Sequence, residues 1–244
     1  MRYYQKSDIG KLRAINQDSC GVFINNNGYI LAIVSDGVGG SKAGEVASGM
    51  AVDLFSETFL KKTFKVSDNI YQWIREEVED INQSIVSAGY ANPDYYGMGA
   101  TLVGTLITNE RTYIFNVGDS RCYLVGDGHM SCVTHDHTLL ASMIESGLVD
   151  KSDPRNDRNR HILVNALGID QPLRVDIEAF NNLYDTLMLC SDGLHGYVAE
   201  ESIKEVLLER SSVDKKVDTL IQMANSVGGF DNVTVVIVEG GDYE

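Results

Sequence analysis

Short apolar runs that start or stop beside an aspartate constrain this chain more than any other feature of its sequence. The runs are residues 29–34, 113–117, 186–190 and 233–238. The first three lead into Asp36, Asp119 and Asp192, and the fourth follows Asp231. Antiparallel pairing places the start of one strand beside the end of its neighbour. We therefore expect the four carboxylates at one edge of a sheet, although a single Asp-Gly pair is also a common turn signal.

A hairpin adds a fifth carboxylate to this group. Residues 25–28 (NNNG) separate two apolar runs and form a strong hairpin signal. Residues that face each other across a hairpin have a constant index sum, so Asp36 should lie opposite a residue between positions 17 and 19. Asp18 is therefore expected near the same edge, and Arg13 is five residues earlier in the chain.

Such a cluster predicts a divalent cation, because clustered carboxylates repel one another unless a cation neutralises them. Carboxylate oxygens, together with a backbone carbonyl at Gly37, favour Mg²⁺ or Mn²⁺ over zinc or copper. Two such ions roughly 3.5–4 Å apart can activate a water for in-line attack at phosphorus. The planar fork of Arg13 matches phosphate oxygens. A salt bridge between Arg13 and Asp18 is an equally open alternative.

Composition excludes several classes of protein. The chain has 244 residues, 43% of them hydrophobic, and a formal net charge of -15, which argues against nucleic acid as a main partner. No apolar run approaches the ~18 residues of a membrane span. The first residues lack the apolar region of a secretory signal. The four scattered cysteines form no C-x-x-C pair and are typical of reduced thiols, so a cytoplasmic protein without a membrane anchor is expected.

The histidines leave a second metal chemistry open. His135 and His137 alternate, so on a strand they would face one side and could bind zinc, but no cysteine or third histidine has suitable spacing. The alternative is a hydrogen-bonded loop after a strand at residues 130–134. His195 follows Asp192 by three residues and is either a site residue or an exposed one.

The order of predicted elements indicates an α+β fold. Helices are expected at residues 45–62, from a cap at Ser67 or Asp68 through Ile85, at 138–145, at 200–208 and at 213–225. Further strands are expected at residues 102–107, 112–117 and 122–125. Strands in adjacent runs with helices in pairs favour α+β over alternating α/β. No repeat or domain boundary is evident, so residues 1–244 are expected to form a single domain, with an exposed loop at 152–161.

Ordered motifs along nearly the whole chain resemble those of one family, the metal-dependent serine/threonine protein phosphatases of the 2C type, and its bacterial branch in particular. The motifs are Ser7-Asp8-Ile9-Gly10 with Arg13, Asn16, Gln17 and Asp18; Ser35 to Gly40; Gly99-Ala100-Thr101; Asn116 to Arg121; Thr134 to His137; Ala166-Leu167-Gly168; Ser191 to Leu194; and Asp231 to Thr234. Each motif alone is weak evidence, whereas the ordered set is very specific.

The resemblance implies a four-layer α/β/β/α sandwich, with two antiparallel sheets face to face, helix pairs outside and a binuclear site at one end. By the same resemblance, Asp36 bridges two Mn²⁺ or Mg²⁺ ions and the Gly37 carbonyl binds the second. Asp192 and Asp231 hold the first ion, Asp18 acts through water, and Asp119 with Asp192 supports a possible third ion. Arg13 binds the phosphate. A mobile flap is expected near residues 148–165, with its core at 153–161.

Two positions depart from the family pattern. Val38 stands where eukaryotic members have a histidine proposed as the general acid, which leaves the acid unassigned. Gln17 replaces a glutamate that many relatives have before Asp18, which removes one charge from the surroundings of the site.

The expected function is the hydrolysis of phosphoserine and phosphothreonine in proteins by water activated at a binuclear Mg/Mn centre. The expected partners are phosphoproteins, including a bacterial serine/threonine kinase and its substrates, and the expected state is a monomer. The alternative is a pseudophosphatase, a phosphoprotein-binding module that keeps the fold without turnover. The intact set Asp36, Asp192 and Asp231 favours the enzyme.

Overall fold

Two five-stranded antiparallel sheets form the centre of the computed structural model, which describes residues 1–38, 43–150 and 159–240. The first sheet has the strand order β1-β10-β9-β6-β7. Its strands are β1 (Arg2–Asp8), β6 (Arg121–Gly126), β7 (His129–Cys132), β9 (Thr186–Cys190) and β10 (Val233–Glu239). The second sheet has the order β2-β3-β4-β5-β8. Its strands are β2 (Asp18–Ile24), β3 (Ile30–Asp36), β4 (Leu102–Ile107), β5 (Arg111–Val117) and β8 (Asp176–Asn181).

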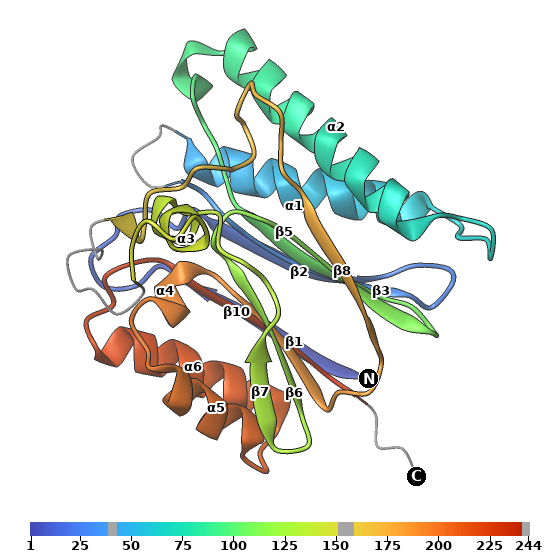
Figure 1. The fold of residues 1–244 in the computed structure, drawn as a ribbon, viewed down its shortest axis with the longest axis vertical. Helices are drawn as coiled ribbons and strands as arrows, with labels where there is room; N and C mark the ends of the chain where they lie inside the picture. Colours follow the sequence, from blue (N-terminus) through green and yellow to red (C-terminus); the bar gives the residue numbers. More distant parts are fainter. Residues whose placement is uncertain (39–42, 151–158, 241–244) are drawn as a thin grey trace.

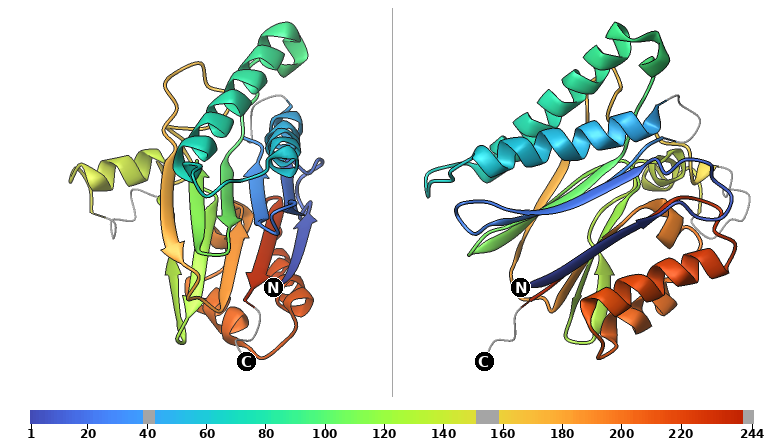
Figure 2. Two further views of the ribbon diagram at one scale, coloured as in Figure 1. Left: turned by 90° about the vertical axis from the view of Figure 1, so that its right-hand side faces the viewer. Right: turned by 180° about the vertical axis from the view of Figure 1, so that it is seen from behind.

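Helix pairs cover the outer face of each sheet, which confirms the four-layer sandwich (Figures 1 and 2). The long helices α1 (Gly44–Lys61) and α2 (Ile70–Ala91) pack on the second sheet, and α5 (Glu200–Leu208) and α6 (Val213–Ser226) pack on the first. A third apolar cluster fills the space between the sheets, with Val34, Val103, Leu189 and Val236 among its buried members. The fold therefore rests on three cores, one between each pair of adjacent layers.

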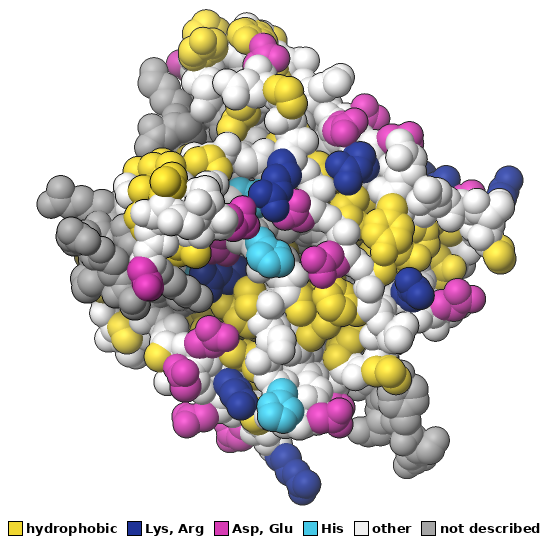
Figure 3. Space-filling view, in the orientation of Figure 1, with side chains coloured by type: hydrophobic (Ala, Val, Ile, Leu, Met, Phe, Trp, Pro, Cys, Tyr) yellow, Lys and Arg dark blue, Asp and Glu magenta, His cyan; other side chains and the backbone are white. Residues whose placement is uncertain are grey.

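Short elements lie near the end of the sandwich where the aspartates are found. They are α3 (Leu139–Glu145) and the one-turn helix α4 (Asp192–His195), whereas the 3₁₀ turn η1 (Pro93–Tyr95) follows α2. Hydrophobic side chains gather over α3 and over the end of α2, and acidic and basic side chains are interspersed over the rest of the face that Figure 3 shows. None of the helices described is long and apolar enough to cross a membrane.

The hairpin register is confirmed. In the β2–β3 pair, Asp18 faces Asp36 directly. The expectation that all the carboxylates share one edge of one sheet is wrong, because Asp36 and Asp119 follow strands of the second sheet whereas Asp192 and Asp231 adjoin strands of the first. They meet at one end of the sandwich because the two sheets are packed face to face.

Other expectations need smaller corrections. The strands β1 and β8 were not anticipated, since both are edge strands whose exposed residues hide the alternation of a half-buried strand. The cap of α2 is Asn69, whose side chain accepts from the Gln72 amide, and not Ser67 or Asp68. Most of the core of the predicted flap, residues 153–158 of 153–161, lies outside the described residues, so the flap stays a prediction.

Candidate functional site

The five predicted carboxylates gather around one pocket of about 250 Å³ at the end of the sandwich. Four of them line it directly, and Asp18 lies buried behind Asp36. The remaining lining residues are Arg13, Gln17, Gly37, Val38, Thr101, His161, Leu163, Tyr197 and Asn232. The structure thus brings together every residue that the sequence nominated for the site.

Asp36 is held in place through its backbone by Thr101, the residue before β4. The Thr101 hydroxyl accepts from the Asp36 amide at 3.0 Å, and the Thr101 amide donates to the Asp36 carbonyl at 2.8 Å. Ser35 Oγ donates to the Thr101 carbonyl at 2.6 Å, and Thr101 Oγ1 lies 2.7 Å from Ser120 Oγ. Because Ser120 follows Asp119, this buried network fixes both aspartates of the second sheet relative to each other.

Gly37 makes the chain turn where a side chain would not fit. A Cβ at this position would lie 2.4 Å from the carbonyl group of Gly44 and 2.8 Å from the Gln17 carbonyl oxygen. The Gly37 amide donates to the same Gln17 oxygen at 3.0 Å. The tight turn brings the Gly37 backbone into the pocket beside Asp36, as a ligand role for its carbonyl requires.

Asp18 is buried and incompletely hydrogen-bonded. Its Oδ2 accepts from Ser191 Oγ at 2.7 Å, whereas its Oδ1 is buried without a hydrogen-bond partner. A buried acceptor without a partner costs about 1–3 kcal/mol, so such an atom requires an explanation. An ion or a water bound to an ion beside Asp36 would satisfy it, which fits the predicted indirect role of Asp18.

The aspartates of the first sheet are set by close packing of α4 against the start of β10. A Cβ at Gly193 would lie 1.9 Å from the Asn232 carbonyl oxygen, so only glycine permits this approach. His195 Nε2 lies 2.9 Å from the backbone oxygen of Asp119 and links the two sheets. His195 is half-buried, which excludes the reading of it as an exposed residue.

Arg13 is bound to a carboxylate of the site, but not to the one considered from the sequence. Its Nη2 donates to Asp231 Oδ2 at 2.7 Å, so the salt bridge to Asp18 that the sequence left open is not formed. The loop that carries Arg13 is anchored by Asn232. The Asn232 side chain accepts from the Gln17 amide at 2.8 Å and donates to the carbonyls of Ile9 at 2.9 Å and Ile15 at 3.0 Å.

Burial and mutual repulsion shift the acidity of the cluster. Burial, followed by the charges of its neighbours, raises the pKa of Asp36 well above its usual range. Burial is also the largest cause that raises the pKa of Asp18 to about 6 and that of Asp119 to about 8. Burial alone would raise the pKa of Asp192 too, but His161 and His195 more than offset it and the pKa is lowered. The site thus disfavours a full set of negative charges unless positive charge enters it.

The donor set fits hard divalent cations: several carboxylates, the backbone of Gly37 and no cysteine in the pocket lining. Within the described ranges, no three His, Cys, Asp or Glu side chains already surround one ion position. One of the carboxylates, Asp231, is instead paired with Arg13 at 2.7 Å. Bringing the oxygens to ligand distance of a cation then requires side-chain adjustment around the pocket.

The zinc alternative for His135 and His137 is not supported by their surroundings. His137 is buried, its Nδ1 accepts from the Gly118 amide at 3.1 Å, and its Nε2 lies 3.1 Å from Asp176. His135 is exposed and neither residue lies on a strand. The hydrogen-bonded loop that the sequence offered as the alternative is therefore the observed structure.

Comparison with known proteins decides the family. A family model described as protein phosphatase 2C matches residues 11–232. The chain belongs to the protein phosphatase 2C family. A relative from Listeria welshimeri, serine/threonine phosphatase stp, is 39% identical over 237 residues, which cover 96% of this chain and 94% of that protein. Protein phosphatase PhpP of Streptococcus pneumoniae is 28% identical over 233 residues, 95% of this chain and 94% of that one.

Solved structures of such phosphatases share the fold. The crystal structure of Stp1 from Staphylococcus aureus has a TM-score of 0.92 at 31% identity and covers 98% of this chain and 94% of its own. The catalytic domain of the phosphatase PstP, solved with two manganese ions, has a TM-score of 0.82 at 31% identity and covers 98% and 97%. The protein is thus a serine/threonine phosphatase of a bacterial 2C type, and its substrates are phosphoproteins.

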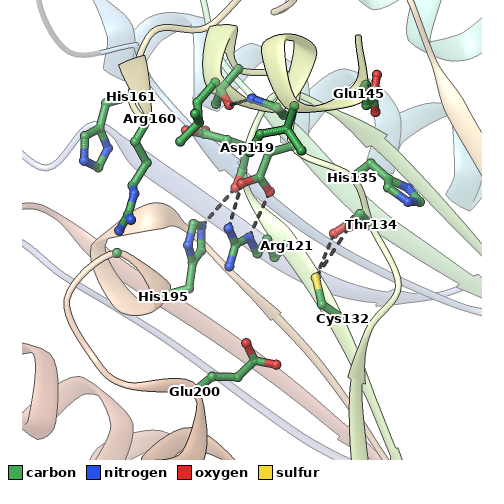
Figure 4. Close-up of a pocket in the computed structure, with 16 residues that line it drawn as sticks. Asp119, Arg121, Cys132, Thr134, His135, Glu145, Arg160, His161, His195 and Glu200 are labelled. Carbon is green, nitrogen blue, oxygen red and sulfur yellow. Dashed lines mark hydrogen bonds and ion pairs between the residues drawn. The ribbon is translucent and has the colours of Figure 1, made fainter. Parts of the chain in front are cut away.

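A second, larger pocket of about 520 Å³ adjoins the catalytic pocket of the phosphatase and shares Asp119 and His161 with it. His161 and Arg160 lie on one side of this pocket, and His135 and Glu145 lie on the other (Figure 4). Arg121 is held in it by Asp136 through two bonds of 2.8 and 2.7 Å. His161 Nδ1 lies 3.6 Å from Asp192 Oδ2. Whereas His195 is part of α4 itself, His161 approaches Asp192 from a different segment of the chain.

Sequence reasoning named the candidate ligands but missed the residues that hold them in place. Thr101, Ser191 and Asn232 lie inside the family motifs, and that position was the only signal for them. Their roles depend on hydrogen bonds between segments more than sixty residues apart, which no local pattern encodes. The structure therefore assigns these three polar residues to the positioning of the site.

Proposed function

We propose that this phosphatase hydrolyses phosphoserine and phosphothreonine at a binuclear Mn²⁺ or Mg²⁺ centre held by the carboxylates of the catalytic pocket. The observation that carries the proposal is the convergence of five carboxylates from both sheets, with one buried Asp18 oxygen left without a partner. When bound, the two ions would supply the positive charge and Lewis acidity that water needs to attack phosphorus. The PstP structure with two manganese ions supports the same cofactor here.

The residues of the pocket divide this work between them. We assign Asp36 to both ions, the Gly37 carbonyl to the second, and Asp192 and Asp231 to the first. Asp18 would act through a water, because it lies behind Asp36 and its Oδ1 is buried without a hydrogen-bond partner. Asp119, whose carboxylate feels the charge of Asp192, would support a third ion together with Asp192 where one binds.

Arg13 would bind the non-bridging phosphate oxygens. It lies at the pocket with its guanidinium on Asp231, about two-fifths exposed, so a phosphate can reach it from solvent. Substrate binding then requires Arg13 to exchange the Asp231 carboxylate for phosphate oxygens. A cation bound at Asp231 favours this exchange because it neutralises the carboxylate that holds the guanidinium.

The physiological setting follows from the substrate class. We propose that the substrates include a serine/threonine kinase and the proteins it phosphorylates, that residues 1–244 act as one catalytic domain and that the enzyme works as a monomer. The relatives named above are phosphatases of similar length, which supports this reading.

Release of inorganic phosphate from phosphothreonine peptides, measured with and without manganese, tests the proposal. We expect turnover that requires the metal and is abolished by Asp36→Asn. Arg13→Ala should mainly raise KM or lower kcat/KM while metal uptake, measured by calorimetry, stays unchanged. Metal uptake without any turnover would instead favour a phosphoprotein-binding module.

A further inference from the structure

Tyr197, which lines the catalytic pocket, forms an exposed aromatic wall with Phe230 beside it. Tyr197 lines the pocket together with Arg13 and the carboxylates, and Phe230 directly precedes Asp231. The two rings lie 5.4 Å apart at 34°. Tyr197 is 36% exposed and Phe230 is 47% exposed. Nothing in the chemistry of phosphate hydrolysis requires an apolar surface at this place.

The pair packs against the chain beside the site. A Cβ at Gly228 would lie 2.2 Å from the Phe230 ring, so the ring packs directly on this glycine. Tyr197 lies near the carboxylates: burial, followed by the charges of Asp192 and Asp231, raises its pKa. The two rings therefore lie beside the carboxylates of the pocket.

Two further apolar side chains are exposed on the loop that carries Arg13. Leu12 and Ile15 flank Arg13 in the chain and are 68% and 57% exposed. The loop is tied to the segment that carries Phe230, because the Leu12 amide donates to the Gly229 carbonyl at 3.2 Å and Asn232 holds the Ile15 carbonyl at 3.0 Å. Exposed apolar groups gathered at one place on a surface mark a contact site more often than isolated ones do.

We propose that Tyr197, Phe230, Leu12 and Ile15 form a specificity surface that binds an apolar side chain next to the phosphorylated residue of the substrate. This inference rests on the proposed function, because it takes the phosphate to bind at Arg13. A peptide advances about 3.3–3.4 Å per residue when extended. A residue adjacent to phosphothreonine is then one such step from a phosphate at Arg13, and Phe230 is the chain neighbour of Asp231, which contacts Arg13.

The charge around the surface favours an apolar occupant over a cationic one. Arg13 lies between Leu12 and Ile15, and Lys11 precedes them in the same exposed loop, so a flanking lysine would meet like charge. The aspartates that could attract it are the ones assigned to metal ions. An aliphatic or aromatic side chain would instead cover rings that water now contacts.

Phosphothreonine peptides that differ only in the flanking residue test the proposal. Leucine, glycine and lysine are placed in turn before and after the phosphothreonine, and kcat/KM is measured with manganese. We expect the leucine peptide to exceed the glycine peptide about tenfold on at least one side, the scale set by burying most of one aliphatic side chain. Phe230→Ala should reduce this preference to about threefold or less, and Phe230→Tyr should retain it.

Leu183→Ala is the matched control. Leu183 is 83% exposed and follows β8 at the opposite end of the sandwich, so its removal should leave the preference unchanged. Thermal melts of each variant verify folding. We expect little loss of stability in the Phe230 variants because its side chain is half exposed. Equal rates for all peptides, a preference for lysine, or an unchanged preference in Phe230→Ala would each overturn the proposal.

Failure of the proposed function is a separate result. If no peptide is hydrolysed, the same peptides are labelled with a fluorophore, and the flanking preference is read from their binding affinity, measured by fluorescence anisotropy. Tighter binding of the leucine peptide, lost in Phe230→Ala, would then support the surface although the catalytic proposal has failed. Equal affinities would overturn the surface as well.

Discussion

Removal of the Asn232 side chain should weaken substrate binding, because Asn232 anchors the loop that carries Arg13. Asn232 is 4% exposed and makes three side-chain hydrogen bonds, to the Gln17 amide and to the carbonyls of Ile9 and Ile15. At about 1 kcal/mol for each bond, Asn232→Ala should cost about 3 kcal/mol of unfolding free energy. Water can partly replace the bonds to Ile9 and Ile15, because both residues are exposed, so the cost should not exceed this figure by much.

The catalytic effect should be distinct from the loss of stability. With its anchor removed, the loop no longer holds Arg13 against the pocket, and we expect kcat/KM for a phosphothreonine peptide to fall about tenfold, which equals about 1.4 kcal/mol. Urea unfolding gives the stability, and phosphate release at saturating manganese gives kcat and KM. The loss should appear mainly in KM.

A matched variant separates the two effects. Asn182 accepts from Thr112 Oγ1 at 2.7 Å and donates to the Thr108 carbonyl at 2.9 Å, at the opposite end of the sandwich. Asn182→Ala should therefore cost about 2 kcal/mol of stability and leave KM unchanged. In an Arg13→Ala background, Asn232→Ala should add less than threefold to the loss of kcat/KM, because its effect passes through Arg13. A full tenfold loss in that background would refute the reasoning.

Three further predictions concern the metal, a buried ion pair and pH. Manganese should raise the melting temperature of the wild type but not that of Asp36→Asn, as scanning calorimetry would show; an equal rise in both would argue against a ligand role. Lys216 and Glu239 are buried and 2.8 Å apart, and Glu239 also pairs with the exposed Arg2 at 3.1 Å. Lys216→Met leaves Glu239 this other partner, so it should cost about 3 kcal/mol in urea unfolding, the low end for breaking a buried pair, and adding Glu239→Leu should recover part of it; simple additivity would contradict this. Burial lowers the pKa of His137, so below pH 6.5 the unfolded chain takes up a proton there that the folded one resists, and this group should lower wild-type stability by at most ~1.4 kcal/mol per pH unit. His137→Gln should flatten that dependence between pH 7 and 5, and equal slopes would refute the assignment.

Local sequence patterns predict the carboxylates well because each lies at a boundary that a single strand defines. The pairing of Asp18 with Asp36 followed from the index sum of one hairpin. What failed was the step from strands to sheets. Strand ends in a sequence do not reveal which sheet each strand joins, so the two-sheet origin of the cluster was inferred only through the family resemblance.

The contacts of Arg13 show the same limit at the level of side chains. A position five residues before Asp18 suggested an ion pair with it, but the loop is held instead by Asn232, and this anchoring aims the guanidinium at Asp231. The edge strand β1 was missed for a related reason: its residues pair with β10 along one edge only, and their exposed side chains carry no local signal.

The division of the carboxylates between two layers ties catalysis to the packing of the whole molecule. A slip of one layer past the other by a single residue would move Asp36 by about 3.3 Å relative to Asp192, whereas metal–ligand distances tolerate only about 0.2 Å. Side chains such as Val34 and Leu189, far from any phosphate, therefore set the geometry of the ligands. Small losses in that interior should silence the enzyme while the chain is still folded.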